Sequence, residues 1–408
     1  MFEGVMNVRA AHPKEYPEIC DLLDKAFKSK LERTIVEVTT SKDTNFEKGD
    51  LRVVEADGKI VSMMMLIRKP LRIGTAVVNG AIVAPVATHP DYQRRGYCSA
   101  VMRNAVQYMK KQGFDISILH GIPWLYPRYG YSPVMVETKL VIKPKQTEKM
   151  AEVPCESRVF TEKDLEQITR IYHLNTATRT LAEIRTPAMW EWKPGGSEAT
   201  IEVFTNTENQ VIGYCAFGTD WESRPCCHEI GVLNDEACRA VFNRILEKAK
   251  MKGVEEFYCS IHPQHPFARF AFGCGSEVRI QAKKSGMARV LNLVQMLTKM
   301  KKEFERRLCR SEFYNVECSF KLSSGNESAV LIVNKGEVTV STEKFKGDLQ
   351  LNIPLKHLNP LITGCKGIRE LAKNPEVEVK GGKRAIRLIE VLFPPGFPSG
   401  GFPPLVWE

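Results

Sequence analysis

The sequence contains no apolar run long enough to cross a membrane. A transmembrane helix needs about 20 consecutive apolar residues, whereas an apolar stretch such as residues 63–67 fits a buried strand. The N-terminus carries Glu3 and has no apolar core of the kind found in secretory signals. We therefore expect no membrane span and no export signal.

The cysteine spacing typical of disulfide-rich or metal-binding proteins is missing as well. The twelve cysteines are scattered among 408 residues and form no Cys-x-x-Cys pair. Such usage favours reduced thiols over a disulfide framework, and it supports no metal site. We therefore expect a cytoplasmic protein without a bound metal.

A basic stripe interleaved with aromatic residues, which is typical of nucleic-acid binders, is also missing. The net charge is +10, but the lysines and arginines are spread along the chain apart from short clusters at residues 299–302 and 306–307. We therefore expect no nucleic-acid partner. A polyphosphate cofactor would use part of the positive surplus.

The residues that are present indicate a globular chain of several domains. The sequence is 43% hydrophobic and 26% charged, and 408 residues exceed one ordinary core, so we predict two or three domains. Residues 1–147 form a mixed α/β pattern. Its elements are a short strand at Val8, a helix over residues 13–27, a hairpin with the turn Asp57-Gly58, a strand over 76–86, a helix over 97–112 and a strand over 115–119.

A basic turn between two of these elements predicts an anion site. Residues 81–86 are apolar enough for a buried strand, and residues 100–109 carry apolar side chains at helical spacing. The main-chain N–H groups between them lie at a helix N-terminus, which suits a pyrophosphate. The predicted binding residues are Gln93, Arg94, Arg95, Gly96, Tyr97, Cys98 and Ser99.

Residues 148–285 repeat this pattern weakly. We predict a helix beginning after Thr161, strands over 210–217 and 228–233, a helix over 237–250 and a strand over 256–260. The turn before the second helix is Asn234-Asp235-Glu236, which is acidic and would repel a pyrophosphate. We therefore predict a second copy of the fold that binds no cofactor.

Residues 286–408 form a third pattern, in which a helix to about residue 307 precedes a sheet and short helices. The strands are predicted over 316–322, 328–334 and 336–341, and the helices over 355–362 and 368–372. Several apolar side chains here could line a cavity or form a plain core. They are Leu351, Ile353, Leu355, Leu358, Leu361 and Ile362.

The basic turn resembles the acyl-coenzyme A signature of the GNAT acetyltransferases, Gln/Arg-x-x-Gly-x-Gly/Ala, with Cys98 at the last position. The whole chain resembles the Eis (enhanced intracellular survival) acetyltransferases, on the anchors 89–96, 125–131 and 287–291. The resemblance implies an α+β fold of mixed α/β type with three parts. These are a catalytic GNAT domain over 1–147, a degenerate GNAT-like domain over 148–285 and a sterol-carrier-like domain over 286–408.

The resemblance also implies an activity: an N-acetyltransferase that moves an acetyl group from acetyl-CoA directly to a primary amine of an aminoglycoside or a lysine. Main chain at Val86, Ala87 and Thr88 would hold the pantetheine arm. Tyr126 would protonate the departing thiolate, since an ordinary tyrosine keeps its proton at neutral pH. Eis relatives assemble as multimers, so a homo-oligomer is expected.

The proton acceptor remains open between several groups. The resemblance implies the terminal carboxylate, here that of Glu408; His120, with an ordinary pKa near 6.5, suits a base; and Glu55 could act through water. Asp21 and Asp24 would either attract a cationic substrate or form a solvated helix face. The alternative function is a lipid- or apolar-ligand-binding protein that acts through the C-terminal domain.

Overall fold

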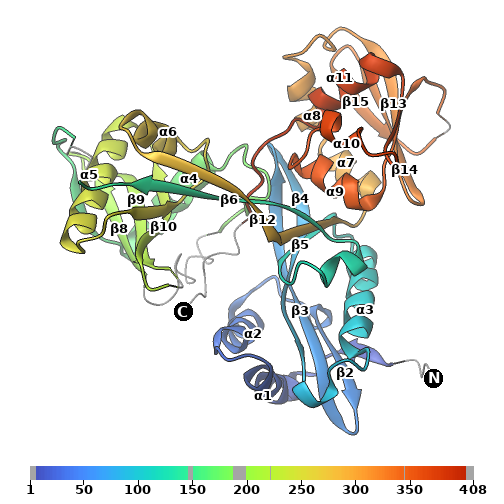
Figure 1. Ribbon diagram of the computed structural model, residues 1–408, viewed down its shortest axis with the longest axis horizontal. Helices are drawn as coiled ribbons and strands as arrows, with labels where there is room; N and C mark the ends of the chain where they lie inside the picture. The colour runs from blue at the N-terminus through green and yellow to red at the C-terminus, as the bar shows by residue number, and fades with distance from the viewer. Residues whose placement is uncertain (1–5, 146–149, 187–198, 221, 344, 401–408) are drawn as a thin grey trace. The chain divides into compact units, whose positions relative to one another are not determined.

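The computed structural model describes residues 6–145, 150–186, 199–220, 222–343 and 345–400. The chain divides into two compact units (Figure 1). The first combines residues up to 135 with residues 283–400, and the second spans residues 136–282. Both contain β-sheet and helices, so the predicted mixed α/β fold is confirmed. Among the described residues, no helix is long and apolar enough to cross a membrane.

The N-terminal region of the first unit is built on a strongly twisted sheet. Its strands are β1 (Val8–Ala10), β2 (Leu51–Ala56), β3 (Lys59–Ile73), β4 (Ala76–Thr88), β5 (Ile116–His120) and residues 286–290 of β12 (Glu277–Val290), in that order. Only β4 and β5 run parallel. The predicted hairpin is present, because Asp57 and Gly58 adopt the positive φ angles of 53° and 69° that a two-residue turn requires.

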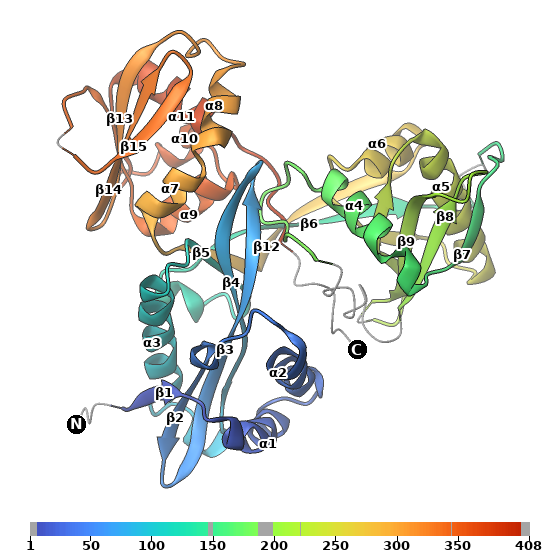
Figure 2. The same ribbon diagram turned by 180° about the vertical axis from the view of Figure 1, so that it is seen from behind.

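Helices cover both faces of this sheet (Figures 1 and 2). Helix α3 (Tyr97–Lys111) packs on one face through the apolar positions predicted from helical spacing. The helix predicted over 13–27 is present as a 3-10 turn followed by α1 (Tyr16–Ala26). The sequence analysis missed α2 (Leu31–Lys42), which is rich in β-branched residues with low helix propensity and depends on buried side chains such as Ile35 and Val36.

The second unit is also built on β-sheet, with helices on both faces. The strand order is residues 136–142 of β6 (Ser132–Ile142), β11 (Phe257–Ser260), β10 (Pro225–Val232), β9 (Val211–Thr219), β8 (Thr200–Thr205) and β7 (Glu156–Val159). Helix α4 (Leu165–Asn175) packs on one face, and α5 (Asp235–Met251) and α6 (Pro266–Gly273) pack on the other. Thr161 and Asp164 cap each other reciprocally, as expected for a helix start.

The C-terminal region of the first unit is a five-stranded sheet with helices over its apolar face. The elements are α7 (Leu293–Lys299), α8 (Lys301–Leu308), β13 (Glu317–Ser324), β14 (Glu327–Asn334), β15 (Glu337–Ser341), β16 (Leu349–Asn352), α9 (Leu355–Thr363), α10 (Ile368–Leu371), β17 (Glu378–Lys380) and α11 (Gly382–Leu392). The sequence analysis missed β16, β17 and α11. Of the six side chains considered as cavity lining, all except Leu355 are at most 2% exposed and belong to the core.

Buried polar contacts fasten this C-terminal region to the N-terminal sheet. The Glu303 carboxylate is completely buried and accepts hydrogen bonds from the main-chain N–H and the hydroxyl of Thr75, at 3.1 and 2.5 Å. Lys299 pairs with the buried carboxylate of Asp115 at 2.6 Å. These contacts explain why residues 283–400 belong to one compact unit with residues near the N-terminus, whereas the division into three domains stays a prediction.

Candidate active site

Strands β4 and β5 pair over a short distance and then separate. Their parallel pairing covers only residues 80–82 of β4 and 116–118 of β5, although β4 continues to Thr88. A β-bulge follows at once, because two residues of β4, Ala84 and Pro85, lie opposite the single residue Met65 of β3. Bulges redirect the strand that contains them. Beyond the bulge, one main-chain edge of β4 is therefore left without a strand partner.

The unpaired edge presents the groups of Val86 and Thr88. The His89 N–H donates to the Val61 carbonyl at 2.9 Å, so His89 faces β3. Because successive residues of an antiparallel strand face alternate sides, Ala87 also faces β3, and its carbonyl accepts a further hydrogen bond from Ser62 Oγ at 2.9 Å. Of the three residues predicted to hold a pantetheine arm, Val86 and Thr88 thus direct their main-chain groups outward and Ala87 directs them inward.

The turn that was predicted to bind an anion leads directly into α3. Gly96 precedes the helix with a left-handed φ of 90°, and no side chain caps the first turn, which carries no acidic residue. The N–H groups of Tyr97, Cys98 and Ser99 have no acceptor within the helix. Among the described residues, a Cβ placed on Gly96 would meet only Met6 within 4 Å, at 3.5 Å.

Two arginines flank this helix start. Arg94 has a positive φ of 62°, which turns the chain toward Gly96. The guanidinium of Arg95 lies over the Tyr92 ring at 5.0 Å, and the Tyr92 hydroxyl donates to Asp57 at 3.1 Å. Gln93 ends the preceding 3-10 turn, with its N–H bonded to the Pro90 carbonyl. Two cations and the open helix N-terminus are suited to a diphosphate.

Tyr126 lies in the 3-10 turn Tyr126–Tyr129 that follows β5. Its side chain is buried, with the ring against Gly121 and edge-on to Tyr131 at 6.2 Å. Burial raises the pKa of Tyr126 above its ordinary value. The phenol therefore stays protonated at neutral pH, and the same shift makes it a weaker acid than an ordinary tyrosine.

Tyr129 and Tyr131 hold the turn in place. The Tyr129 hydroxyl lies 2.9 Å from Ser99 Oγ in the first turn of α3. The Tyr131 hydroxyl lies 2.8 Å from Ser117 Oγ on β5. The turn that carries Tyr126 is thus tied to both neighbouring elements.

His120 is less suited to act as a base than its ordinary pKa suggested. Burial lowers the pKa of His120 to about 3, and Lys283 lowers it further by charge repulsion. A histidine with such a pKa takes a proton from an ammonium ion poorly at neutral pH. Its Nε2 lies 3.4 Å from the Gly400 carbonyl, which brings the last described residue of the chain to the end of β5.

The other carboxylates considered from the sequence are already ion-paired. Glu55 is exposed and contacts Arg9 at 3.0 Å. Asp24 binds Arg33 at 2.5 Å, which reduces the attraction of this helix face for a cationic substrate. Glu408 lies outside the described residues.

The corresponding turn of the second unit has a different cap. Asn234 precedes α5, and its side chain accepts a hydrogen bond from the Ala237 N–H at 2.8 Å. Asp235 and Glu236 place two carboxylates in the first turn. This helix start supplies its own hydrogen-bond acceptor and would repel an anion.

In the second unit, the main-chain groups at the outward edge of β10 are hydrogen-bonded by a side chain of the same unit. Strand β10 has a bulge at His228 and pairs with β11 only at residues 226–227, so it separates from its neighbour as β4 does. Beyond the bulge, the Asn175 side chain bonds both the N–H and the carbonyl of Val232 at 2.9 Å. His265 Nε2 lies 3.1 Å from Asn175 Oδ1 and completes the group.

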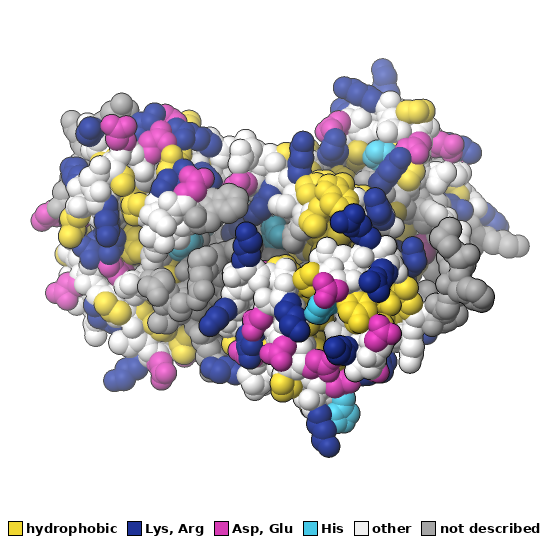
Figure 3. Space-filling view, turned by 60° about the horizontal axis from the view of Figure 1, so that its bottom comes forward, with side chains coloured by type: hydrophobic (Ala, Val, Ile, Leu, Met, Phe, Trp, Pro, Cys, Tyr) yellow, Lys and Arg dark blue, Asp and Glu magenta, His cyan; other side chains and the backbone are white. Residues whose placement is uncertain are grey.

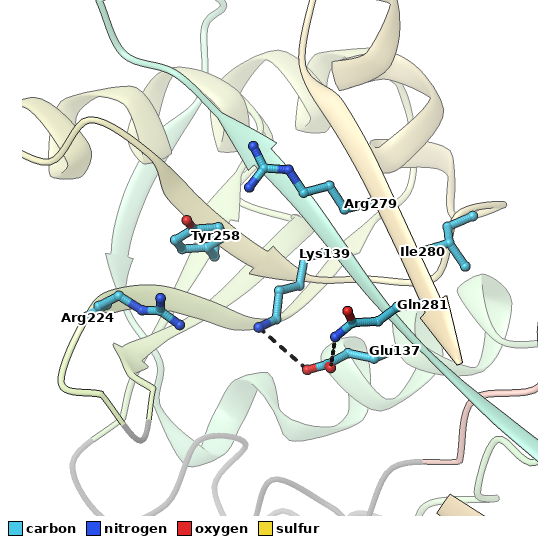
Figure 4. Close-up of a pocket in the computed structure, with 7 residues that line it drawn as sticks. All are labelled: Glu137, Lys139, Arg224, Tyr258, Arg279, Ile280 and Gln281. Carbon is cyan, nitrogen blue, oxygen red and sulfur yellow. Dashed lines mark hydrogen bonds and ion pairs between the residues drawn. The ribbon is translucent and has the colours of Figure 1, made fainter. Parts of the chain in front are cut away.

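A separate hollow of about 250 Å³ lies within the second unit (Figure 4). Three cations line it, and each already faces a carboxylate, so the hollow offers no uncompensated charge to an anion. The pairs are Lys139–Glu137 at 3.6 Å, Arg224–Asp220 at 2.7 Å and Arg279–Glu256 at 2.7 Å.

On the face shown in Figure 3, basic and acidic side chains are likewise interspersed. Among the described residues, no group of three or more His, Cys, Asp or Glu could hold a metal ion.

Comparison with known families identifies the N-terminal region. Residues 7–134 match the family model described as "Acetyltransferase (GNAT) domain". This segment contains the separated strands β4 and β5, the open start of α3 and the turn with Tyr126. The chain therefore carries a GNAT acetyltransferase domain over these residues. No curated protein matches the sequence.

Solved structures share the fold over nearly the whole chain. A protein of Enterococcus faecalis V583, described as a probable N-acyltransferase, has a TM-score of 0.74 at 18% identity, over 97% of this chain and 98% of its own. A GCN5-related N-acetyltransferase of Anabaena variabilis ATCC 29413 has a TM-score of 0.76 at 16% identity, over 96% and 98%. Eis1 of Mycobacterium abscessus has a TM-score of 0.68 at 16% identity, over 96% and 98%. At these identities the likeness concerns the fold.

Proposed function

We propose that this chain is an N-acetyltransferase that moves an acetyl group from acetyl-CoA directly to a primary amine. The observation that carries the proposal is the open start of α3 beside the unpaired edge of β4, within a GNAT domain. The main-chain N–H groups from Arg94 to Ser99 would bind the diphosphate, with Arg94 and Arg95 adding charge. Val86 and Thr88 would hold the pantetheine arm and polarise the thioester carbonyl.

The transfer needs one proton removed and one supplied. The amine nitrogen attacks the thioester carbon, the C–S bond breaks, and the thiolate takes a proton from the Tyr126 hydroxyl. The attacking amine gives its proton to a base, for which we retain the terminal carboxylate of Glu408 or a water molecule. His120 is a weaker candidate, because its low pKa makes it a poor proton acceptor.

The acceptor is a primary amine of the aminoglycoside or lysine type, and the active form is a homo-oligomer; both parts of the proposal rest on the resemblance to Eis proteins. The C-terminal region is proposed to be a sterol-carrier-like domain. An apolar-ligand carrier has less support, because five of the six side chains suggested as cavity lining pack in the core.

The proposal is tested by following release of the coenzyme A thiol with a panel of aminoglycosides, polyamines and lysine peptides. We expect turnover with at least one amine and a fall in kcat of about 100-fold for Tyr126→Phe, which removes the proton donor. Tyr258→Phe, which removes a hydroxyl that donates to Glu256 in the second unit, is the control and should keep most of the activity. A chain that neither releases thiol nor binds coenzyme A in a calorimetric titration would overturn the proposal. Gly96→Asp should abolish such binding.

A further inference from the structure

We propose that Asn359 and Arg289 are positioning residues that hold the turn carrying Tyr126. Both lie far from that turn in the sequence, Asn359 in α9 and Arg289 in β12. This assignment rests on the proposed function, because it concerns the orientation of the proposed proton donor. It makes the C-terminal region part of the active site rather than an appended domain.

The turn ends in a conformation that exposes main-chain carbonyls. Gly130 follows Tyr126–Tyr129 with a left-handed φ of 80°, and its N–H bonds back to the Pro127 carbonyl. The Tyr131 N–H reaches the Tyr126 carbonyl at 3.4 Å. The carbonyls of Tyr129 and Gly130 then point out of the turn and need donors from elsewhere.

Asn359 and Arg289 supply those donors. Asn359 is completely buried; its Nδ2 donates to the Gly130 carbonyl at 2.9 Å and to Ser132 Oγ at 3.0 Å. Its Oδ1 accepts from the Val290 N–H at 2.9 Å. Arg289 Nη1 donates to the Tyr129 carbonyl, and a Cβ on Gly130 would lie 2.6 Å from the same nitrogen. The end of the turn is therefore closely enclosed by these two side chains.

The other side of the turn faces the proposed substrate. Tyr129 is bonded to Ser99, which lies among the N–H groups assigned to the diphosphate. The turn thus spans from the diphosphate site to the C-terminal region, with Tyr126 between the two attachments. A displacement of about 1 Å at a reacting group lowers the rate by as much as about 100-fold. A fully buried amide with three hydrogen bonds restricts such displacement.

The test uses Asn359→Leu, which keeps the volume and removes all three hydrogen bonds. We expect the folded variant to lose at least about 10-fold in kcat while the KM for acetyl-CoA changes less than about twofold, because only the turn is displaced. Thr363→Val is the matched control. It removes a buried hydroxyl from the same helix, one that bonds the Asn359 carbonyl and does not contact the turn, and it should leave kcat unchanged.

A double-mutant cycle with Tyr126→Phe separates positioning from general support. If Asn359 acts through Tyr126, then Asn359→Leu lowers kcat in the wild-type background and changes it less than about twofold when Tyr126 is Phe. Equal losses in both backgrounds, or no loss in either, would overturn the assignment. Should Asn359→Leu fail to fold, Arg289→Met is used in the same cycle with the same criteria. A wild-type chain that binds coenzyme A but acetylates no amine would instead contradict the proposed function. That result differs from equal losses in the double-mutant cycle, which contradict only the role of Asn359.

Discussion

The two units contain the same strand–turn–helix arrangement, but only one leaves it open. In the first unit, β4 bulges, separates from β5 and leads to α3 through a left-handed glycine without a side-chain cap. In the second unit, β10 also bulges and separates from β11, but it leads to α5 through Asn234, whose side chain caps the helix. The frame of the fold is therefore the same, and the groups offered to a ligand differ.

The comparison extends to the strand edges. Val86 and Thr88 direct main-chain groups toward an unpaired side of β4, whereas the equivalent edge of β10 is occupied at Val232 by Asn175. The second unit supplies from its own side chains the hydrogen bonds that a bound ligand would supply in the first. Buried polar groups need hydrogen-bond partners, and Asn175, with His265 beside it, supplies them at this edge.

The largest effect is expected when the helix cap of α5 is transferred to α3. Gly96→Asn combined with Tyr97→Asp gives α3 the N-cap residue and the first residue of α5. We expect the affinity for coenzyme A, measured by calorimetry, to fall on the order of 1,000-fold. An acid in the first turn opposes the diphosphate, and the asparagine occupies an N–H group that the ligand needs.

The reciprocal change is the control for this transplant. Asn234→Gly combined with Asp235→Tyr removes the cap from α5 and should leave the affinity for coenzyme A unchanged, with one molecule bound per chain. A transplanted first unit that still binds coenzyme A normally would show that the helix start does not hold the diphosphate.

A second prediction concerns the occupied edge of β10. Asn175→Ala removes the partner of the Val232 N–H and carbonyl, and it leaves His265 without its contact to the amide. We expect a loss of about 3 kcal/mol in the free energy of unfolding, measured by denaturant titration, because buried polar groups left unsatisfied cost about 1–3 kcal/mol each. Coenzyme A affinity should be unaffected. A second bound coenzyme A in this variant would contradict the view that the second unit has lost its site.

A smaller effect is expected from Arg94→Gly. Glycine adopts the φ of 62° at this position more easily than arginine, so the turn is retained while one positive charge is removed. We expect the KM for acetyl-CoA to rise about fivefold, consistent with about 1 kcal/mol for one partly exposed charge beside a phosphate, with kcat and thermal stability maintained. An unchanged KM would mean that the main-chain N–H groups bind the diphosphate without help from this side chain.

A further prediction concerns the acid sensitivity that His265 gives to the second unit. Burial lowers the pKa of His265 to about 3, with Arg179 and His262 as further causes and a hydrogen bond to the Ile230 main chain opposing them. Because the folded state binds fewer protons than the unfolded state below the ordinary pKa of 6.5, its contribution to stability is complete above that pH and is lost as the pH falls.

The variant for this test is His265→Asn, which retains an N-cap residue for α6 but does not titrate. Between pH 6.5 and 5, we expect the free energy of unfolding of the wild type to fall more steeply than that of the variant. The difference in slope is up to about 1.4 kcal/mol per pH unit for one proton. Parallel pH dependence in the two proteins would mean that His265 has the same pKa in the folded and unfolded chains, and it would contradict the prediction.

Local patterns predicted much of the fold. The hairpin at Asp57-Gly58, the helix α3 and the capped start at Thr161 each follow from neighbouring residues, because turn geometry, helical spacing and capping act over a few positions. Helix α2 was missed because its β-branched residues favour strand, and its formation depends on burial against distant elements.

The sequence by itself predicted where a basic turn leads into a helix and where the corresponding turn is acidic, since both depend on the charge and backbone preferences of adjacent residues. Only the tertiary structure decided that His120 has a low pKa, that Asn175 occupies the edge of β10 and that Asn359 reaches the turn of Tyr126. These properties depend on burial and on contacts between residues dozens to hundreds of positions apart. No local pattern carries that information.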